Sequence, residues 1–198
     1  MSVLITLGAC GKLRKSRTQS VHPYDGGDMI NVPIDQSVLY GIWKNDDINA
    51  VIEVSGDKRK LIQYGAITTA PKVAIPYRLR AIAQGIRQLM DVYQPDDVAF
   101  EELFFSKNIT TGMAVSMARG VALATVVERT DNLYEYTPMQ IKQAVTGYGG
   151  ADKHQVQQMV KLLLNMKEIA RPDDAADALA AALTHANSLR TKHLFAIQ

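Results

Sequence analysis

The spacing of apolar residues changes along this 198-residue chain, and the change limits the folds it can adopt. Two short β-rich runs, Val51–Val54 and Lys60–Tyr64, flank the turn pair Gly56-Asp57, which predicts a β-hairpin. Farther on, apolar residues recur at helical spacing over 77–93, which indicates an amphipathic helix. Strands thus come first and a helix follows them.

The rest of the chain alternates between the two kinds of element. The spacing predicts strands and helices in this order: a strand at 98–101, a helix at about 110–128, a strand at 133–136, and helices that begin at Thr137, Asp152 and Pro172. Thr137, Pro138 and Gln140 together form a capping-box start. This order predicts an α/β domain with a mixed β-sheet flanked by α-helices.

The first residues carry no clear motif. Gly8 and Gly11 are too close together for a phosphate-binding loop, and no positive segment precedes the opening apolar run, as a secretory signal requires. We expect a short strand or a loosely ordered extension over 1–28. The domain itself is expected at 29–190, with a C-terminal tail at 191–198.

Composition excludes several classes of protein. A single Cys cannot form an internal disulfide, and no apolar run reaches the ~18 residues that span a bilayer. The formal net charge of +2 argues against a protein that coats nucleic acid nonspecifically. We therefore expect a cytoplasmic protein with no membrane contact.

Three acidic residues have a setting suited to binding a metal ion. Glu101 closes a predicted strand, and ligand sites favour the carboxyl ends of strands in α/β sheets. Asp174 and Asp177 are three residues apart and share one helix face. They could instead be solvated residues that favour the helix N-terminus. However, Ala178 and Ala181 flank them, and such small residues allow another surface to approach closely.

Several tracts carry a family resemblance from about Val51 to Ser188. In order along the chain they are Ala99–Phe105, Ala118–Gly120, Tyr134–Thr137, Ile141–Gly149, Ala151–Lys153 and Pro172–Ala180. Their joint order and spacing resemble the RuvC Holliday junction resolvases. The resemblance implies an RNase H-like fold, a homodimer and Mg²⁺-dependent, symmetric cleavage of four-way DNA junctions. Two Mg²⁺ ions would be bound per active site, Mn²⁺ could substitute, and a branch-migration complex is a further expected partner.

The resemblance also assigns residues. Glu101, Asp174 and Asp177 match three of the family's four metal-binding acids. Phe104 matches an aromatic residue that such enzymes insert at the junction, although Phe104 or Phe105 could equally be ordinary core. Lys142 and Lys153 match basic positions near the scissile phosphate, and without the family they would be read as solvated lysines.

The fourth acid of the family, on its first strand, has no clean counterpart here. The best candidate is Asp35, which ends the alternating run 30–34, so we expect it as a catalytic metal ligand. A rival alignment puts the run 38–42 on the first strand and leaves Trp43 at the acid's position. Asp46 or Asp47 would then have to substitute from a turn. Alternatively, residues 1–50 do not descend from the family at all.

These observations leave three functions open. The chain is an active junction endonuclease, a junction-binding protein that has lost its first-strand acid, or an RNase H-like nuclease for another branched DNA. The resemblance favours the first.

Overall fold

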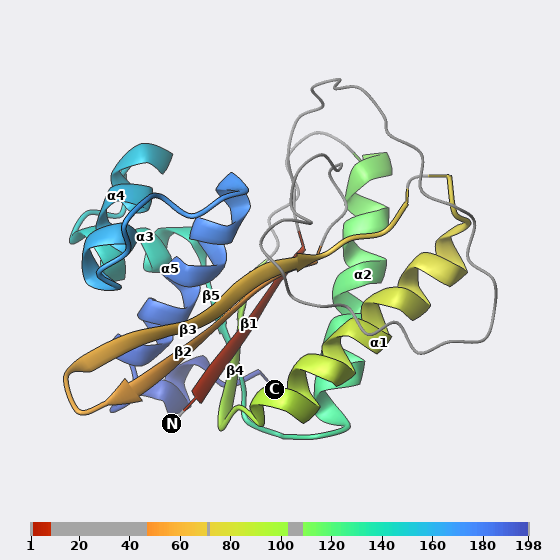
Figure 1. The fold of residues 1–198 in the computed structure, drawn as a ribbon, viewed down its shortest axis with the longest axis horizontal. Coiled ribbons are helices and arrows are strands. Elements are labelled where there is room, and N and C mark those ends of the chain that lie inside the picture. The colour runs from red at the N-terminus through yellow and green to blue at the C-terminus, as the bar shows by residue number, and fades with distance from the viewer. Residues whose placement is uncertain (1, 9–46, 71, 103–108, 198) are drawn as a thin grey trace.

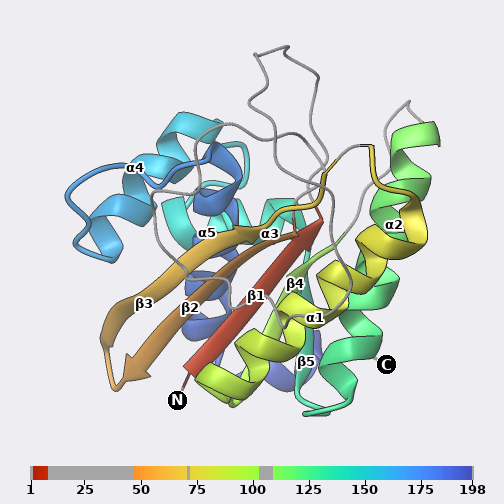
Figure 2. The same cartoon turned by 45° about the vertical axis from the view of Figure 1, so that its right-hand side comes forward.

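A mixed five-stranded sheet forms the centre of the computed structural model, which describes residues 2–8, 47–70, 72–102 and 109–197. The strands are β1 (Ser2–Gly8), β2 (Asp47–Ser55), β3 (Lys58–Ile67), β4 (Asp97–Glu101) and β5 (Leu133–Tyr136). Their spatial order is β3-β2-β1-β4-β5, and Figure 2 shows them side by side. β1 pairs with β2 antiparallel, whereas β1, β4 and β5 run parallel. The predicted mixed sheet is confirmed.

β1 lies in the middle of this sheet. It pairs with β2 on one side, where Ser2 faces Glu53, and with β4 on the other, where Thr6 faces Phe100. Of the two expectations for the opening residues, the strand is therefore the one that the structure shows. The expectation of an extension outside the domain is wrong for residues 2–8, because their apolar run supplies the pairing that joins the hairpin to β4. The remainder of 1–28, and the runs expected at 30–34 and 38–42, lie outside the described residues.

The predicted hairpin is confirmed as β2 and β3. Its turn is made by Gly56 and Asp57, and Gly56 has a φ of +58°, in the region that glycine adopts without a Cβ penalty. A register shift between Val51 and Ile52 bends the pair.

Helices cover both faces of the sheet, as Figure 1 shows. One layer holds α1 (Ile75–Tyr93) and α2 (Ile109–Val127), and the other holds α3 (Pro138–Thr146), α4 (Lys153–Leu163) and α5 (Asp173–Asn187). Alternate residues of β4 point into these two layers. Phe100 packs in the core beside α1 and α2, whereas Ala99 packs in the core beside α5.

Local sequence signals set the ends of the helices. Thr137 accepts a hydrogen bond from the Gln140 backbone and the Gln140 side chain accepts one from the Thr137 backbone, so the predicted capping box forms at α3. Asp152 and Gln155 make the same arrangement at α4. Pro172 precedes α5, as expected.

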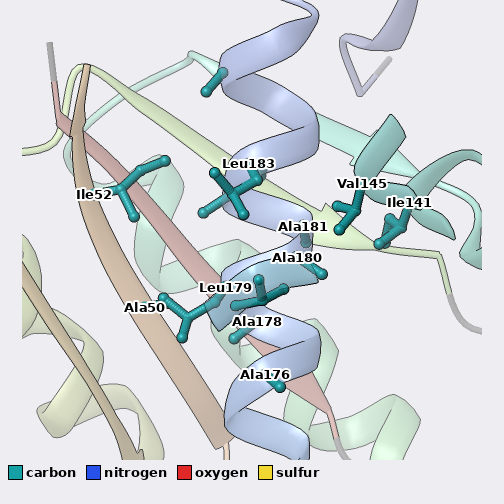
Figure 3. Close-up of a cluster of buried hydrophobic side chains, with 14 of the residues drawn as sticks. Ala50, Ile52, Ile141, Val145, Ala176, Ala178, Leu179, Ala180, Ala181 and Leu183 are labelled. Atoms are coloured by element: carbon teal, nitrogen blue, oxygen red, sulfur yellow. The ribbon is translucent and has the colours of Figure 1, made fainter. Parts of the chain in front are cut away.

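α5 is buried on nearly every side. Its alanines lie against the sheet on one side and against α3 and α4 on the other, and Figure 3 shows them with Ala50, Ile52, Ile141 and Val145. Ala178 and Ala181 are both 0% exposed, so the close approach expected from these small residues is confirmed. A backbone that packs this closely on two layers fixes the position of the first turn of α5, where Asp174 lies.

The C-terminal residues also join the sheet. The short helix η2 (Lys192–Phe195) lies next to β5, and Ala196 forms a bridge to Tyr134. Lys192 Nζ contacts both carboxylate oxygens of Asp97 at 2.8 Å, and His185 Nε2 lies 3.0 Å from Asp97 Oδ2. Asp97 and His185 are fully buried. The segment expected as a tail is therefore attached to the start of β4.

None of the helices formed by the described residues has the length and apolar character needed to cross a membrane.

Candidate active site

Glu101 ends β4 at the carboxyl edge of the sheet, as predicted. The preceding strand residues are buried and Glu101 itself is half-buried. Ala99 points toward α5, so the alternation of the strand directs the Glu101 side chain to the same side. That side holds the first turns of α5.

Asp174 and Asp177 lie one turn apart at the start of α5, and both contact Lys153. The Lys153 Nζ atom is 3.1 Å from Asp174 Oδ1 and 3.2 Å from Asp177 Oδ2. Lys153 comes from the first residue of α4, directly after its capping Asp152. The structure thus brings together an ammonium and two carboxylates that the sequence analysis named separately.

The ionisation of these groups shows that Glu101 belongs to the same cluster. Burial, together with the negative charges of Asp177 and Asp174, raises the pKa of Glu101 from 4.5 to about 7, against the opposing effect of Lys153 and Arg119. Burial also raises the pKa of Asp177, which outweighs its ion pair with Lys153. Burial lowers the pKa of Lys153, but its contacts with Asp177 and Asp174 outweigh burial, so the net shift is upward. Carboxylates that repel one another in this way favour binding of a cation.

Carboxylate oxygens are the donors that Mg²⁺ prefers, so the chemistry of Glu101, Asp174 and Asp177 fits this ion. In the part of the chain whose side chains are described, no three acidic, His or Cys side chains are arranged closely enough to hold a metal ion. The two aspartates instead hold the Lys153 ammonium. Binding of a metal ion would therefore require Lys153 to give up part of these contacts.

β1 offers no carboxylate to this edge of the sheet. It is the strand beside β4, and its sequence, Ser-Val-Leu-Ile-Thr-Leu-Gly, contains no acid. Asp35, the expected fourth ligand, and Phe104, the expected junction-inserting residue, both lie outside the described residues. Their roles stay predictions.

Lys142 lies on α3 and is half-buried. No ion pair to it is found among the described residues. α3 packs against α5 through the shared core that contains Ile141 and Val145. The structure therefore places Lys142 on a helix that neighbours the acidic cluster but does not bring its side chain into contact with the acids.

Arg119 is a functional candidate that the sequence analysis did not assign a role. Its Nη1 donates to the Glu101 carbonyl oxygen at 2.8 Å, and its Nη2 forms an ion pair with the Glu135 carboxylate. A signal for it existed in the sequence. Arg119 is the single charged residue of α2, whose other side chains are apolar or small and neutral, and a charge in such a helix needs a partner.

Comparisons with known proteins identify relatives of this chain. The family model described as "Crossover junction endodeoxyribonuclease RuvC" matches residues 48–185. A protein of that name from Alkaliphilus metalliredigens is 51% identical over 148 residues, which are 75% of this chain and 90% of that protein. A solved structure of Thermus thermophilus RuvC in complex with a Holliday junction substrate is similar with a TM-score of 0.74 and 28% identity. That match covers 96% of this chain and 95% of the other.

Proposed function

Because this chain belongs to the RuvC family of crossover junction endodeoxyribonucleases, we propose that it is a Mg²⁺-dependent endonuclease that resolves four-way DNA junctions. The family resemblance and the RNase H-like fold expected from the sequence are confirmed. The observation that carries the proposal is the pairing of Lys153 with both Asp174 and Asp177 near the edge of the sheet where Glu101 ends β4.

The three acids and Lys153 would have different parts in the reaction. Glu101, Asp174 and Asp177 would hold Mg²⁺, which when bound activates water and stabilises charge on the scissile phosphate. Glu101 has a pKa of about 7 without a metal ion, and a proton competes with the metal ion for its carboxylate, so activity should fall at acidic pH. Lys153 already lies beside the acids and would stabilise the negative charge that develops on the phosphate.

Lys142 and Phe104 complete the proposed DNA contacts. Lys142 would bind a backbone phosphate from α3, and Phe104 would stack on an unpaired base. Such stacking is worth about 1–3 kcal/mol per base. Together these contacts would recognise the shape of the junction, since phosphate contacts position DNA without reading its sequence.

A homodimer is part of the proposal, since symmetric cleavage of two strands requires two active sites. The surface of α2 supports it: Met113 and Met117, one turn apart, are 57% and 40% exposed. α2 contains mostly apolar residues, and a helix that is apolar on most sides is typically buried on most sides. A second copy of this chain would cover the exposed methionines.

A second candidate function rests on the sequence of β1. If no acid reaches the position beside Glu101, the chain would bind junctions but not cut them. Asp35 decides between the two functions, and it remains our candidate for the fourth ligand.

Nicking of a synthetic four-way junction tests the proposal. The wild-type protein should produce symmetric nicks in Mg²⁺ or Mn²⁺ and none in EDTA, and Glu101→Gln should reduce the rate by about 100-fold or more. Asp91→Asn, at an exposed residue near the end of α1 that pairs with Arg129, is a control with one carboxylate removed and should retain the wild-type rate.

The outcomes separate the candidates. Binding of the junction without nicking by the wild type would contradict the nuclease proposal and favour the binding protein. Nicking that persists in Asp35→Asn would contradict only the assignment of Asp35. Nicking of flapped DNA in preference to junctions would favour the third function. The proposal also includes a cytoplasmic location and a branch-migration complex as a partner.

A further inference from the structure

Arg119 links three elements at the edge of the sheet where the acids lie. It extends from α2, its guanidinium donates to the Glu101 carbonyl at the end of β4, and it pairs with Glu135 in β5. The Arg119 side chain is 14% exposed, and its guanidinium lies over the Phe100 ring, 5.4 Å from the centroid. A planar guanidinium can make all three contacts at once, because its donors lie in a fixed fork and its face can stack on an aromatic ring.

Arg119 contacts Glu101 from the α1–α2 layer, whereas Asp174 and Asp177 lie in α5 on the other face of the sheet. Phe100 pairs with Glu135 in the sheet, and Phe100 packs in the core that includes α1 and α2. Glu101 is the next residue and directs its side chain toward α5 instead. Arg119 therefore holds the backbone of Glu101 while leaving its carboxylate free to face Asp174 and Asp177.

We infer that Arg119 is a positioning residue that fixes the end of β4, so that the Glu101 carboxylate stays on the side of the sheet that faces the α5 aspartates, from which the three acids would bind a shared metal ion. This inference rests on the proposed metal-dependent activity. Glu101 is the last residue of its strand, and the N–H of Glu102, the residue that ends this described segment of the chain, donates to the Tyr136 carbonyl of β5. The hydrogen bond from Arg119 to the Glu101 carbonyl is thus a further restraint on the backbone of the proposed metal ligand.

The pairing with Glu135 holds Arg119 itself in place. Without that carboxylate, the guanidinium would still donate to the Glu101 carbonyl but would lose its second anchor. Lysine at this position would keep the positive charge, but a single ammonium cannot reproduce the fork or stack on Phe100. The inference therefore predicts that geometry, and not charge alone, is what Arg119 contributes.

Calorimetric titration of the full-length protein with Mn²⁺, without DNA, tests this inference apart from activity. Arg119→Met and Arg119→Lys should both weaken Mn²⁺ binding by about 10- to 100-fold, the range found when residues that support a metal ligand are replaced. Arg87→Met is the matched control. Arg87 of α1 makes a forked pair at 2.7 and 2.8 Å with Glu128, which directly follows α2, and neither residue contacts Glu101 or its partners in the hydrogen bonds found among the described residues, so loss of Arg87 should leave Mn²⁺ affinity unchanged.

A double variant separates positioning from charge balance. Arg119→Met with Glu135→Met replaces the pair by apolar side chains, which should recover the midpoint of thermal unfolding lost in Arg119→Met. If Mn²⁺ affinity stays low in this variant, Arg119 positions Glu101. If affinity returns to the wild-type value, or if Arg119→Lys binds like the wild type, the inference is overturned. A wild-type protein that binds no Mn²⁺ overturns the metal-dependent function and this inference together.

Discussion

Glu101 ends a buried strand opposite two aspartates, and its ionisation depends on those surroundings. In the unfolded chain its carboxyl ionises near pH 4.5, whereas in the folded protein its pKa is about 7. Between these values the folded state holds a proton that the unfolded state has released. The contribution of Glu101 to the free energy of unfolding therefore falls as the pH rises from 4.5 to about 7.

Glu101→Gln should remove this pH dependence, because glutamine has no charge to bury. In EDTA at pH 8 we expect the variant to be more stable than the wild type by up to about 3 kcal/mol, and at pH 4 we expect little difference. Urea denaturation at the two pH values measures this. Glu53→Gln, in the exposed part of the hairpin, is the control for loss of a surface carboxylate. An equal effect of Glu101→Gln at both pH values would contradict the prediction.

The three acids could be predicted from the sequence around each of them, but the contacts that Lys153 and Arg119 make around them could not. Glu101 follows a buried strand, and Asp174 and Asp177 share a helix face, so local patterns place each of them. The contact of Lys153 with both aspartates depends on how α4 packs against α5, which no local pattern contains. The lone charge of Arg119 in an apolar helix indicates that it has a partner, but the local sequence does not identify that partner, since the residues it contacts lie in the strands that precede and follow α2.

β1 is the element that differs most from expectation. Seven residues whose sequence favours either a strand or an extension form the central strand of the sheet, since only pairing on both sides, with β2 and β4, satisfies their backbone. Helices and the hairpin could be predicted because capping residues, turn residues and apolar spacing lie within each of them. The partners of β1 lie far along the chain, and the sequence contains no local sign of them.

The register of β1 predicts a gain-of-function variant. Thr6 pairs with Phe100, so Leu7 lies at the next register position, beside Glu101. If the site lacks a fourth acid, Leu7→Asp should tighten Mn²⁺ binding and raise the rate of junction nicking, by about tenfold or more. Calorimetry and nicking assays measure the two effects. The same substitution combined with Asp35→Asn provides the comparison: a gain seen only in the combined variant would mean that Asp35 already supplies the fourth ligand.

Assembly is a property of the whole molecule, and α2 is where we expect it. Replacing both Met113 and Met117 by Lys should convert a dimer into monomers, because two charges per chain would be buried at the contact. Sedimentation velocity measures the change. Val92→Lys, at an even more exposed apolar residue of α1, is the control and should leave the assembly unchanged. A wild-type protein that sediments as a monomer at micromolar concentration would contradict the proposed dimer.

The ion pair between Lys192 and Asp97 should matter for the stability of the whole molecule. Asp97 is fully buried, so Lys192→Met would leave a buried carboxylate with only His185 as a partner. Burial lowers the pKa of His185, so in the wild-type protein His185 is a neutral donor to Asp97 and Lys192 supplies the positive charge. We expect a loss of about 3–5 kcal/mol in the free energy of unfolding. Lys60→Met, which breaks the exposed pair with Glu53, should change stability by less than about 1 kcal/mol.

The same ion pair has a consequence for the order in which the protein is made. Asp97 leaves the ribosome well before its partners, since Lys192 follows it by 95 residues and His185 by 88. At the usual speed of bacterial translation, about 5–20 residues per second, that interval lasts on the order of 5–20 seconds. During this time β4 contains a carboxylate whose burial is not yet compensated. The nascent sheet should therefore stay open around β4 until the segment 185–192 has been synthesised, and a nascent chain stalled before that point should be cleaved readily by protease.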